Sequence, residues 1–259
     1  QALFKIASIS KLYTAVSVAK LVNRGHLSLD NTLADYFPEL AGRIENAENI
    51  TLRMMVQHRS GIPNYTNTPN FWSQPTLSYQ ESLDLILDQE ASFQPGTDYE
   101  YSNTNYLLLS KLIEKTTGKE KFEYIQEVIL NPLDLQNTFN SIDDIDIERL
   151  MGAYHLTVEE NFKASHYGSM IATAEDVAIF VRALNDGSLF DEGGKEIYAS
   201  IYEYEHGGWI PGYQSHVKYY EDIDTVVVQF NNTTDSELYY WNLSQIIFSR
   251  IESIVERSE

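Results

Sequence analysis

Residues 4–11 read Phe-Lys-Ile-Ala-Ser-Ile-Ser-Lys and place Ser8 three residues before Lys11. Apolar residues recur at steps of three and four from Ser8 onward to residue 23, which predicts a helix that Gly25 closes. A hydroxyl at the start of a helix lies where free backbone N–H groups and the dipole stabilise developing negative charge. A side chain three residues later lies on the same helix face, within reach of that hydroxyl. The stretch therefore predicts a serine nucleophile, Ser8, beside a base, Lys11.

The same Ser-x-x-Lys spacing occurs twice more, at Ser17/Lys20 and at Ser215/Lys218. Ser17 falls inside the predicted helix, where its N–H is already bonded to the preceding turn. Ser215 begins a predicted strand, in which a three-residue step puts the two side chains on opposite faces. Only the pair in residues 4–11 therefore has a geometry that suits nucleophilic catalysis.

Hydrophobic periodicity outside this stretch predicts further helices and one antiparallel hairpin. The expected helices cover residues 51–58, 78–88, 102–117, 121–130, 173–184 and 239–257, and the expected hairpin strands cover residues 215–220 and 225–230. The helices fill the middle of the chain and the strands come late, which is typical of an α/β protein of the α+β type with an antiparallel sheet flanked by helices. The last helix is expected to be amphipathic, with an apolar face of Leu243, Ile246, Ile247, Ile251 and Ile254.

Composition excludes several classes of partner. The chain has 259 residues, with 18 Lys and Arg against 38 Asp and Glu, so its net charge of −20 disfavours nucleic acids and anionic membrane surfaces. No apolar run reaches the ~20 residues of a membrane span. The chain has no Cys, which excludes thiol nucleophiles, disulfides and metal–thiolate centres. The six His lack the spacing of a helical metal pair, so we expect no metal and no cofactor, and we expect every His except His206 to be exposed or hydrogen-bonded.

Two short patterns supply further candidates. Tyr-x-Asn occurs three times, and only Tyr101 and Asn103 follow a tight turn, at residues 94–97, and stand at the start of a predicted helix. His-x-Gly occurs twice, and the pair His206 and Gly208 leads into the sheet region. Backbone without side chains lets a ligand approach closely there.

Six segments in order resemble the serine β-lactamase and penicillin-binding-protein superfamily, in particular its branch of class C β-lactamases, DD-peptidases and esterases. They are residues 4–11, 57–63, 95–103, 131–135, 172–176 and 206–208. The chain departs from the family pattern at Asp134, where Gly is usual, and at residues 57–59, where Gln-His-Arg replaces Thr-His-Thr. Its third motif is His-Gly-Gly instead of Lys-Thr-Gly.

The resemblance implies a fold of the β-lactamase/transpeptidase type with two lobes. We expect residues 1–25 and 168–259 to form the sheet-containing lobe and residues 26–167 to form a mostly helical lobe. The family begins with two strands before the Ser-x-x-Lys helix, and these are missing here. We therefore expect a second copy of the chain or an upstream segment to complete the sheet, because an open apolar edge invites pairing.

The resemblance also implies roles for the candidate residues. Ser8 attacks a carbonyl and forms an acyl-enzyme, and Lys11, with a pKa lowered by desolvation, accepts or relays the Ser8 proton. Tyr101 passes the proton to the leaving group and then activates water. Asn103 orients Lys11 and the substrate amide.

The resemblance also implies that the backbone N–H groups of Ser8 and Trp209 form an oxyanion hole and that His206 lines the opposite wall. His206 contacts the substrate, and Gly208 lets the strand approach it closely. Since the reference pKa of His is ~6.5, His206 is expected to be mostly neutral at pH 7.

These residues predict a serine hydrolase of a small ester, a D-amino-acid peptide or a β-lactam. The alternative is a catalytically silent module that recognises penicillins for binding or sensing. All side chains needed for the chemistry are present, which favours the enzyme. The resemblance further implies a periplasmic or extracellular location.

Overall fold

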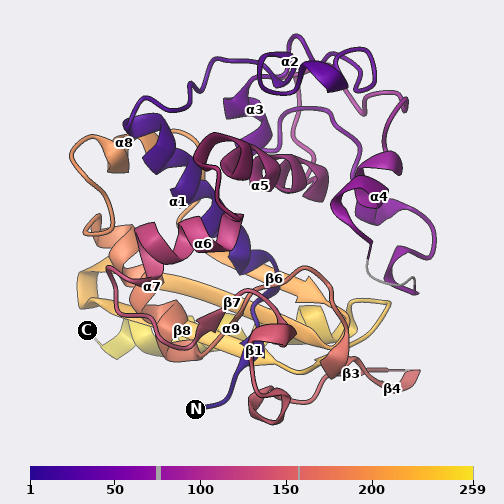
Figure 1. The fold of residues 1–259 in the computed structure, drawn as a ribbon. Coiled ribbons are helices and arrows are strands. Elements are labelled where there is room, and N and C mark those ends of the chain that lie inside the picture. The colour runs from indigo at the N-terminus through magenta and orange to yellow at the C-terminus, as the bar shows by residue number, and fades with distance from the viewer. Residues whose placement is uncertain (74–76, 157, 259) are drawn as a thin grey trace. The chain divides into compact units, whose positions relative to one another are not determined.

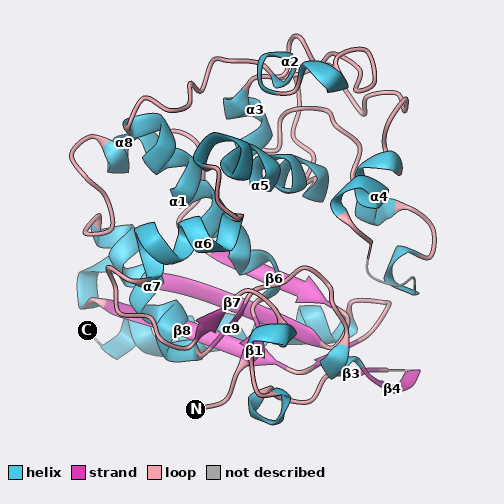
Figure 2. Ribbon diagram, in the orientation of Figure 1, coloured by secondary structure: helices cyan, strands magenta, loops and turns pink. Residues whose placement is uncertain are grey.

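The computed structural model describes residues 1–73, 77–156 and 158–258, and the chain divides into two compact units (Figures 1 and 2). The first, here called the sheet unit, consists of Gln1–Tyr13, Gln126–Phe190 and Glu203–Glu259. The second, the helical unit, consists of Thr14–Ile125 and Asp191–Tyr202.

This division differs from the expected lobes. Residues 126–167 belong to the sheet unit because they supply strands: β2 (Thr138–Phe139) pairs with β5 (Ile171–Ala172), and β3 (Tyr154–His155) pairs with β9 (Thr233–Thr234). Residues 191–202 belong instead to the helical unit. The guanidinium of Arg53 and the side chain of Gln57 both donate to the backbone carbonyl of Ser200 there, at 3.1 and 3.0 Å.

The main sheet of the sheet unit has three antiparallel strands in the order β6 (His206–Ile210), β7 (Tyr213–Tyr220) and β8 (Thr225–Asn231). The expected hairpin is therefore confirmed. Helix α7 (Ala174–Asp186) begins at its Thr173 cap, as the sequence predicts, and packs against β7 and β8.

The two faces of this sheet meet different elements. On one face Ser215 of β7 donates to the carbonyl of Ile6, directly before the 3-10 turn η1 (Ala7–Ile9). On the other face the ring of His216 lies 4.6 Å from that of Trp241 in helix α9 (Tyr239–Val255). The sheet therefore lies between the segment that carries Ser8 and the C-terminal helix.

Two smaller sheets complete the unit. The first has the order β1 (Phe4–Lys5), β5 and β2, and it is antiparallel throughout. The second has the order β4 (Val158–Asn161), β3 and β9, with a parallel pairing between β3 and β9. Strand β1 ends two residues before η1, so the first small sheet anchors the chain just upstream of Ser8.

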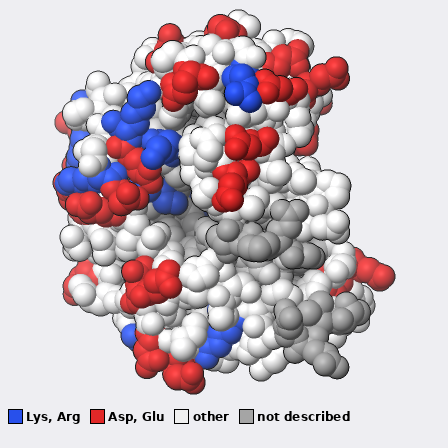
Figure 3. Space-filling view, turned by 45° about the vertical axis from the view of Figure 1, so that its right-hand side comes forward, with Lys and Arg blue, Asp and Glu red and all other residues white. Residues whose placement is uncertain are grey.

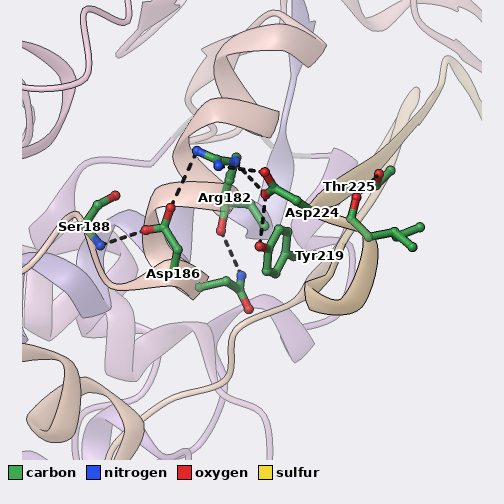
Figure 4. A network of polar contacts seen from close by, with 9 residues as sticks. Arg182, Asp186, Ser188, Tyr219, Asp224 and Thr225 are labelled. Atoms are coloured by element: carbon green, nitrogen blue, oxygen red, sulfur yellow. Dashed lines mark hydrogen bonds and ion pairs between the residues drawn. The ribbon is translucent and has the colours of Figure 1, made fainter.

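A polar network ties the β7–β8 turn to α7 (Figure 4). Arg182 of α7 donates two hydrogen bonds of 2.7 Å to the carboxylate of Asp224, which also accepts from the hydroxyl of Tyr219 at 3.1 Å. Asp224 has a left-handed backbone, φ 47°, which Asp tolerates better than most residues because its short side chain bonds locally. The bidentate pair therefore fixes a turn whose backbone conformation is uncommon.

The orientation of α9 corrects one expectation. The helix buries Ser244 and Phe248, whereas the predicted apolar face is largely exposed, with Ile246 at 52% and Ile254 at 63%. Ser244 is buried because it accepts hydrogen bonds from Gln229 and Asn231 of β8. Periodicity locates an apolar stripe on a helix, but it does not say which stripe meets the sheet.

The helical unit contains most of α1 (Ser10–Asn23) together with the following elements: α2 (Leu33–Tyr36), α3 (Leu52–Val56), α4 (Tyr79–Asp84), α5 (Asn103–Thr117), α6 (Lys121–Ile125) and α8 (Gly194–Ala199). Capping residues explain where two of the predicted helices begin or end. Ser78 and Glu81 form a reciprocal capping box at the start of α4, and Gly118 ends α5 in a left-handed conformation, φ 70°. The helix expected over 121–130 is α6 followed by a π-helical turn over Gln126–Leu130.

On the face drawn in Figure 3, Lys and Arg side chains lie among Asp and Glu side chains and form no broad basic surface in the described part of the chain. Among the described residues, no helix is both long enough and apolar enough to cross a membrane.

Candidate active site

Ser8 lies in the 3-10 turn η1, directly before α1, and Lys11 lies in the first turn of that helix. The ammonium of Lys11 donates to Ser8 Oγ over 3.1 Å. Lys11 is only 9% exposed, and this burial lowers its pKa from 10.5 to about 7. A substantial fraction of Lys11 is therefore neutral at physiological pH and able to accept a proton from the hydroxyl beside it.

The two other Ser-x-x-Lys pairs have different surroundings. Ser17 is fully buried within α1. Ser215 is buried and donates to the carbonyl of Ile6, whereas Lys218 forms an ion pair of 3.1 Å with Glu252. The Ser215 hydroxyl and the Lys218 amine therefore have other partners, and Ser17 is enclosed by its own helix.

Strand β6 packs directly on the turn that carries Ser8. A Cβ on Gly208 would lie 2.8 Å from both the Cβ of Ala7 and the carbonyl oxygen of Ile6, and 2.5 Å from Ser215 Oγ. These distances leave no room for any side chain, so glycine at this position allows the strand to approach the nucleophile turn.

Trp209 follows Gly208, and its backbone N–H points to the edge of β6 that does not pair with β7. Pro211 and Gly212 form a two-residue turn, so Ile210 and Tyr213 are the hydrogen-bonded pair that closes it. Hydrogen-bonded and non-bonded pairs alternate along an antiparallel ladder, and the Trp209–Gln214 pair is therefore non-bonded. The N–H of Trp209 points away from β7, as an oxyanion-hole donor on this strand must.

His206 occupies the same face of β6 as Gly208, because side chains alternate along a strand. Its side chain is 7% exposed, its Nε2 lies 3.4 Å from a carboxylate oxygen of Glu203, and its Nδ1 contacts the carbonyl of Gly207. Burial first, and then the charge of Lys11, lower the pKa of His206 to about 4. The imidazole is therefore neutral at pH 7, more completely than its reference pKa predicts.

Tyr101 and Asn103 belong to the helical unit, at the start of α5. The Tyr101 ring lies 4.4 Å from the ring of His58, whose Nδ1 accepts the Ser102 N–H at 3.2 Å. Asn103 donates its backbone N–H to Asn64 and its side-chain amide to Thr66, each at 3.0 Å. The structure thus groups Tyr101 with Asn103 in one unit, and Ser8 and Lys11 with His206, Gly208 and Trp209 in the other.

The sequence model of the family described as Beta-lactamase matches residues 1–200 of this chain. The chain belongs to the Beta-lactamase family. A penicillin-binding protein of Bacillus subtilis (strain 168) is 29% identical over 140 residues, which cover 52% of this chain and 30% of that protein. Protein flp of Staphylococcus aureus (strain MW2) is 28% identical over 136 residues, 52% of this chain and 27% of that protein. The matched region is thus less than a third of the length of these curated relatives.

A solved structure agrees with this assignment at the level of the fold. The D-amino acid amidase of Ochrobactrum anthropi SV3, in complex with L-phenylalanine amide, has a TM-score of 0.85 and 23% identity, covering 99% of this chain and 85% of that chain. The expected β-lactamase/transpeptidase-like fold is therefore confirmed.

Two residues of this Beta-lactamase family chain lie near the Ser8 turn or His206 without standing out in the sequence. Glu203 contacts His206, and Ser169 accepts a hydrogen bond from the N–H of Ala7 at 2.7 Å. No short motif includes Glu203 together with a catalytic pattern, and Ser169 lies more than 160 residues from its partner in the chain. Only the three-dimensional fold brings Ser169 to its partner.

His216 corrects an expectation. It is buried against Trp241 and Phe248, and its Nε2 has no hydrogen-bond partner among the residues that the structure describes. Across residues 1–73, 77–156 and 158–258, no group of three or more His, Asp or Glu side chains is placed to hold a metal ion.

Proposed function

We propose that this chain is a serine hydrolase that cleaves esters or amides through an acyl-enzyme on Ser8. The observation that carries the proposal is the 3.1 Å contact between Lys11 Nζ and Ser8 Oγ, with the pKa of Lys11 lowered to about 7. Neutral Lys11 takes the hydroxyl proton as Oγ bonds to the carbonyl carbon of the substrate. The tetrahedral intermediate collapses, the leaving alcohol or amine departs with a proton, and water later releases the acid and regenerates Ser8.

The oxyanion of each intermediate requires hydrogen-bond donors. We assign them to the N–H groups of Ser8 and Trp209, and in other enzymes each such donor contributes ~3–4 kcal/mol to the transition state. The match to the family pattern supports Tyr101 as the group that protonates the leaving atom and activates water. It also supports Asn103 as the residue that orients Lys11 and the substrate amide.

The charge state of His206 and the acidic side chain beside it support a class of substrate. A neutral His206 supplies no fixed cation for a substrate carboxylate, and Glu203, at 3.4 Å from it, supplies an anion. The fold is also that of a D-amino acid amidase whose structure holds an amino acid amide. We therefore propose uncharged short esters, or amides that carry a free cationic amine, as better substrates than penicillins and cephalosporins.

A covalent serine probe tests the nucleophile. Incubation with a fluorophosphonate, followed by mass spectrometry, is expected to add one probe to the peptide that contains Ser8. Ser8→Ala should abolish the adduct, and the control Ser17→Ala, in the helix that follows Ser8, should keep it. An adduct that survives Ser8→Ala contradicts the proposal. A wild-type chain that takes up no probe but retains a penicillin reversibly would support the silent binding module.

We further propose that the protein acts in the periplasm or outside the cell, on a small molecule or peptide. A second copy or an upstream segment would pair with the outer edge of β8. Sedimentation of the purified chain measures directly whether a second copy binds.

A further inference from the structure

The residue before the nucleophile has an uncommon backbone conformation. Ala7 has φ +50°, in the left-handed region that a Cβ disfavours. Such a conformation persists only when the surrounding structure holds it, and it is found mostly at functional sites. The contacts that hold Ala7 therefore set the direction of the Ala7–Ser8 peptide.

The main contact is a hydroxyl from a distant part of the chain. Ser169 Oγ accepts the Ala7 N–H at 2.7 Å and donates its own proton to the carbonyl of Met170, also at 2.7 Å. The same Met170 carbonyl accepts the N–H of Ile6 at 3.0 Å. Because the Ser169 hydroxyl both accepts and donates a hydrogen bond, the position of the oxygen that Ala7 bonds is fixed.

The segment that presents Ser169 is itself tied to the nucleophile region at both ends. Met170 donates its N–H to Ser10 Oγ in the first turn of α1, at 3.2 Å. Lys5, which is buried, donates to the carbonyls of Phe162 (3.3 Å) and Ser165. Segment 162–170 is therefore hydrogen-bonded to residues on both sides of Ser8, so it holds Ser169 at a fixed place relative to the turn that carries Ser8.

The strand side of the turn is equally confined. Ser215 holds the Ile6 carbonyl at 2.9 Å, and Gly208 leaves no space above Ala7. Ser169 accepts the N–H and Ser215 holds the carbonyl of the same Ile6–Ala7 peptide, so the two hydroxyls fix this peptide from its two ends. Loss of the Ser169 acceptor leaves only the carbonyl end held, so the peptide can rotate and change φ at Ala7. That rotation would move the Ser8 N–H and the Ser8 hydroxyl together.

From this geometry we propose that Ser169 is a positioning residue for the nucleophile, acting through Ala7, in the reaction proposed above. It holds Ala7 left-handed and so keeps Ser8 Oγ beside Lys11 and the Ser8 N–H at the oxyanion. The inference rests on Ser8 being the nucleophile. It requires that the hydroxyl of Ser169, and not merely its volume, determines the rate of acylation.

The test replaces the hydroxyl at nearly constant volume. Ser169→Cys keeps the size but offers only a weak acceptor, whereas Ser169→Thr keeps the hydroxyl. A displacement of ~1 Å at a catalytic group costs about 10²-fold in rate. We therefore expect Ser169→Cys to lower the acylation rate with a p-nitrophenyl ester by about 10–100-fold, with KM within about twofold and an unchanged melting temperature. Ser169→Thr should stay within about threefold of the wild type.

A second substitution separates positioning from general damage. Glycine takes the left-handed conformation without steric cost, so Ala7→Gly combined with Ser169→Cys should recover at least about tenfold of the lost acylation rate. Ser253→Ala is the control, because Ser253 also donates to a backbone carbonyl, at 3.0 Å, but on the exposed side of α9. Its acylation rate should equal that of the wild type.

Three results would overturn the inference: wild-type acylation in Ser169→Cys, a loss in Ser169→Thr as large as in Ser169→Cys, or no recovery in the double variant. Each can be observed while Ser8 still reacts with the fluorophosphonate. Failure of the positioning role is thus distinguishable from failure of the proposed nucleophile, which the Ser8→Ala variant reports.

Discussion

The ammonium of Lys11 lies 3.1 Å from Ser8 Oγ and is almost completely buried, so the residue that must lose its charge to act as a base is held where that charge is disfavoured. Burial lowers the pKa of Lys11 to about 7. The same burial that makes Lys11 a base at neutral pH destabilises the folded protein.

The first prediction concerns the pH dependence of the reaction. Because Lys11 must be neutral to accept the Ser8 proton, kcat/KM for a neutral ester should rise about tenfold per pH unit below pH 7 and level off above it. Lys11→Arg, which stays charged, should lose ~10²–10⁴-fold at every pH between 6 and 9. A profile of the wild type that is flat from pH 5 to 8 would contradict the role of Lys11 as base.

The second prediction concerns stability. The folded pKa of Lys11, about 7, lies below the ordinary 10.5, so between these values the unfolded chain binds more protons on Lys11 than the folded protein does. The destabilisation is therefore complete below pH 7 and disappears as the pH rises toward 10.5. Since each tenfold change in proton affinity corresponds to ~1.4 kcal/mol, we expect Lys11→Met to gain at least ~1–2 kcal/mol at pH 6.

Urea unfolding of wild type and Lys11→Met at pH 6 and pH 10 measures this gain. It should shrink at the higher pH, while the variant shows no esterase activity. Equal stability of the two proteins at pH 6 would mean that Lys11 is not buried as a cation in the folded state.

Local sequence patterns predicted much of this fold, because the residues that cap the helices lie next to the helix ends that they determine. The start of α4 follows from Ser78 and Glu81, and the end of α5 follows from Gly118. The pairing of Lys11 with Ser8 also follows from local spacing, because three residues of helical turn bring the two side chains together. Each of these features depends on residues within one or two turns of each other.

Features that depend on long-range contacts could not be predicted. The burial of Phe248 in place of Ile246 depends on which side of α9 meets Gln229 and Asn231. The Ser169 contact to Ala7 joins residues 162 positions apart. The low pKa of His206 arises from packing and from Lys11, and no pattern of neighbouring letters encodes either. The roles of Tyr101 and Asn103 remain predictions from the family pattern.

The third prediction concerns Gly208. A methyl group there would meet Ala7, Ile6 and Ser215 at 2.5–2.8 Å, so Gly208→Ala must push β6 away from the nucleophile turn. A displacement of this size should lower kcat/KM for an ester by about 10²-fold or more. Gly25→Ala is a useful control for expression, since nothing lies within 4 Å of that position, although its φ of +71° carries a backbone cost. Activity within threefold of wild type in Gly208→Ala would show that β6 does not press on the turn.

The fourth prediction concerns the orientation of α9. Phe248 is buried against His216, so Phe248→Ala should lower the free energy of unfolding by ~3 kcal/mol or more. Ile246 is 52% exposed, so Ile246→Lys should change the free energy of unfolding by less than ~0.5 kcal/mol. Urea unfolding compares the two variants. A large loss in Ile246→Lys would mean that this face of α9 is covered in solution, by a second copy or by another segment.

The fifth prediction concerns Glu203 and the amine of the substrate. Its carboxylate lies 3.4 Å from Nε2 of the neutral His206, which places an acidic side chain beside that residue. Glu203→Gln should reduce kcat/KM for an amino acid amide by about 5–10-fold, as expected for the loss of a charge-assisted hydrogen bond. The N-acetylated amide, which lacks the cation, should be hydrolysed equally by both proteins. Equal losses on the two substrates would assign Glu203 to holding His206 instead of the amine.

The last prediction concerns the charge at position 206. A pKa of about 4 keeps His206 neutral at pH 7, so it cannot offer a substrate carboxylate the charge-assisted hydrogen bond that a lysine offers. Such a bond contributes ~1.5–3 kcal/mol, which is roughly tenfold to a hundredfold in kcat/KM. His206→Lys should therefore raise the ratio of kcat/KM for a chromogenic cephalosporin to that for a p-nitrophenyl ester by about this factor. His206→Gln, which stays neutral, should leave the ratio within about threefold of the wild type. If the wild type already hydrolyses the cephalosporin more than tenfold faster than the ester, neutral His206 does not set the preference, and a β-lactamase activity should replace the proposed one.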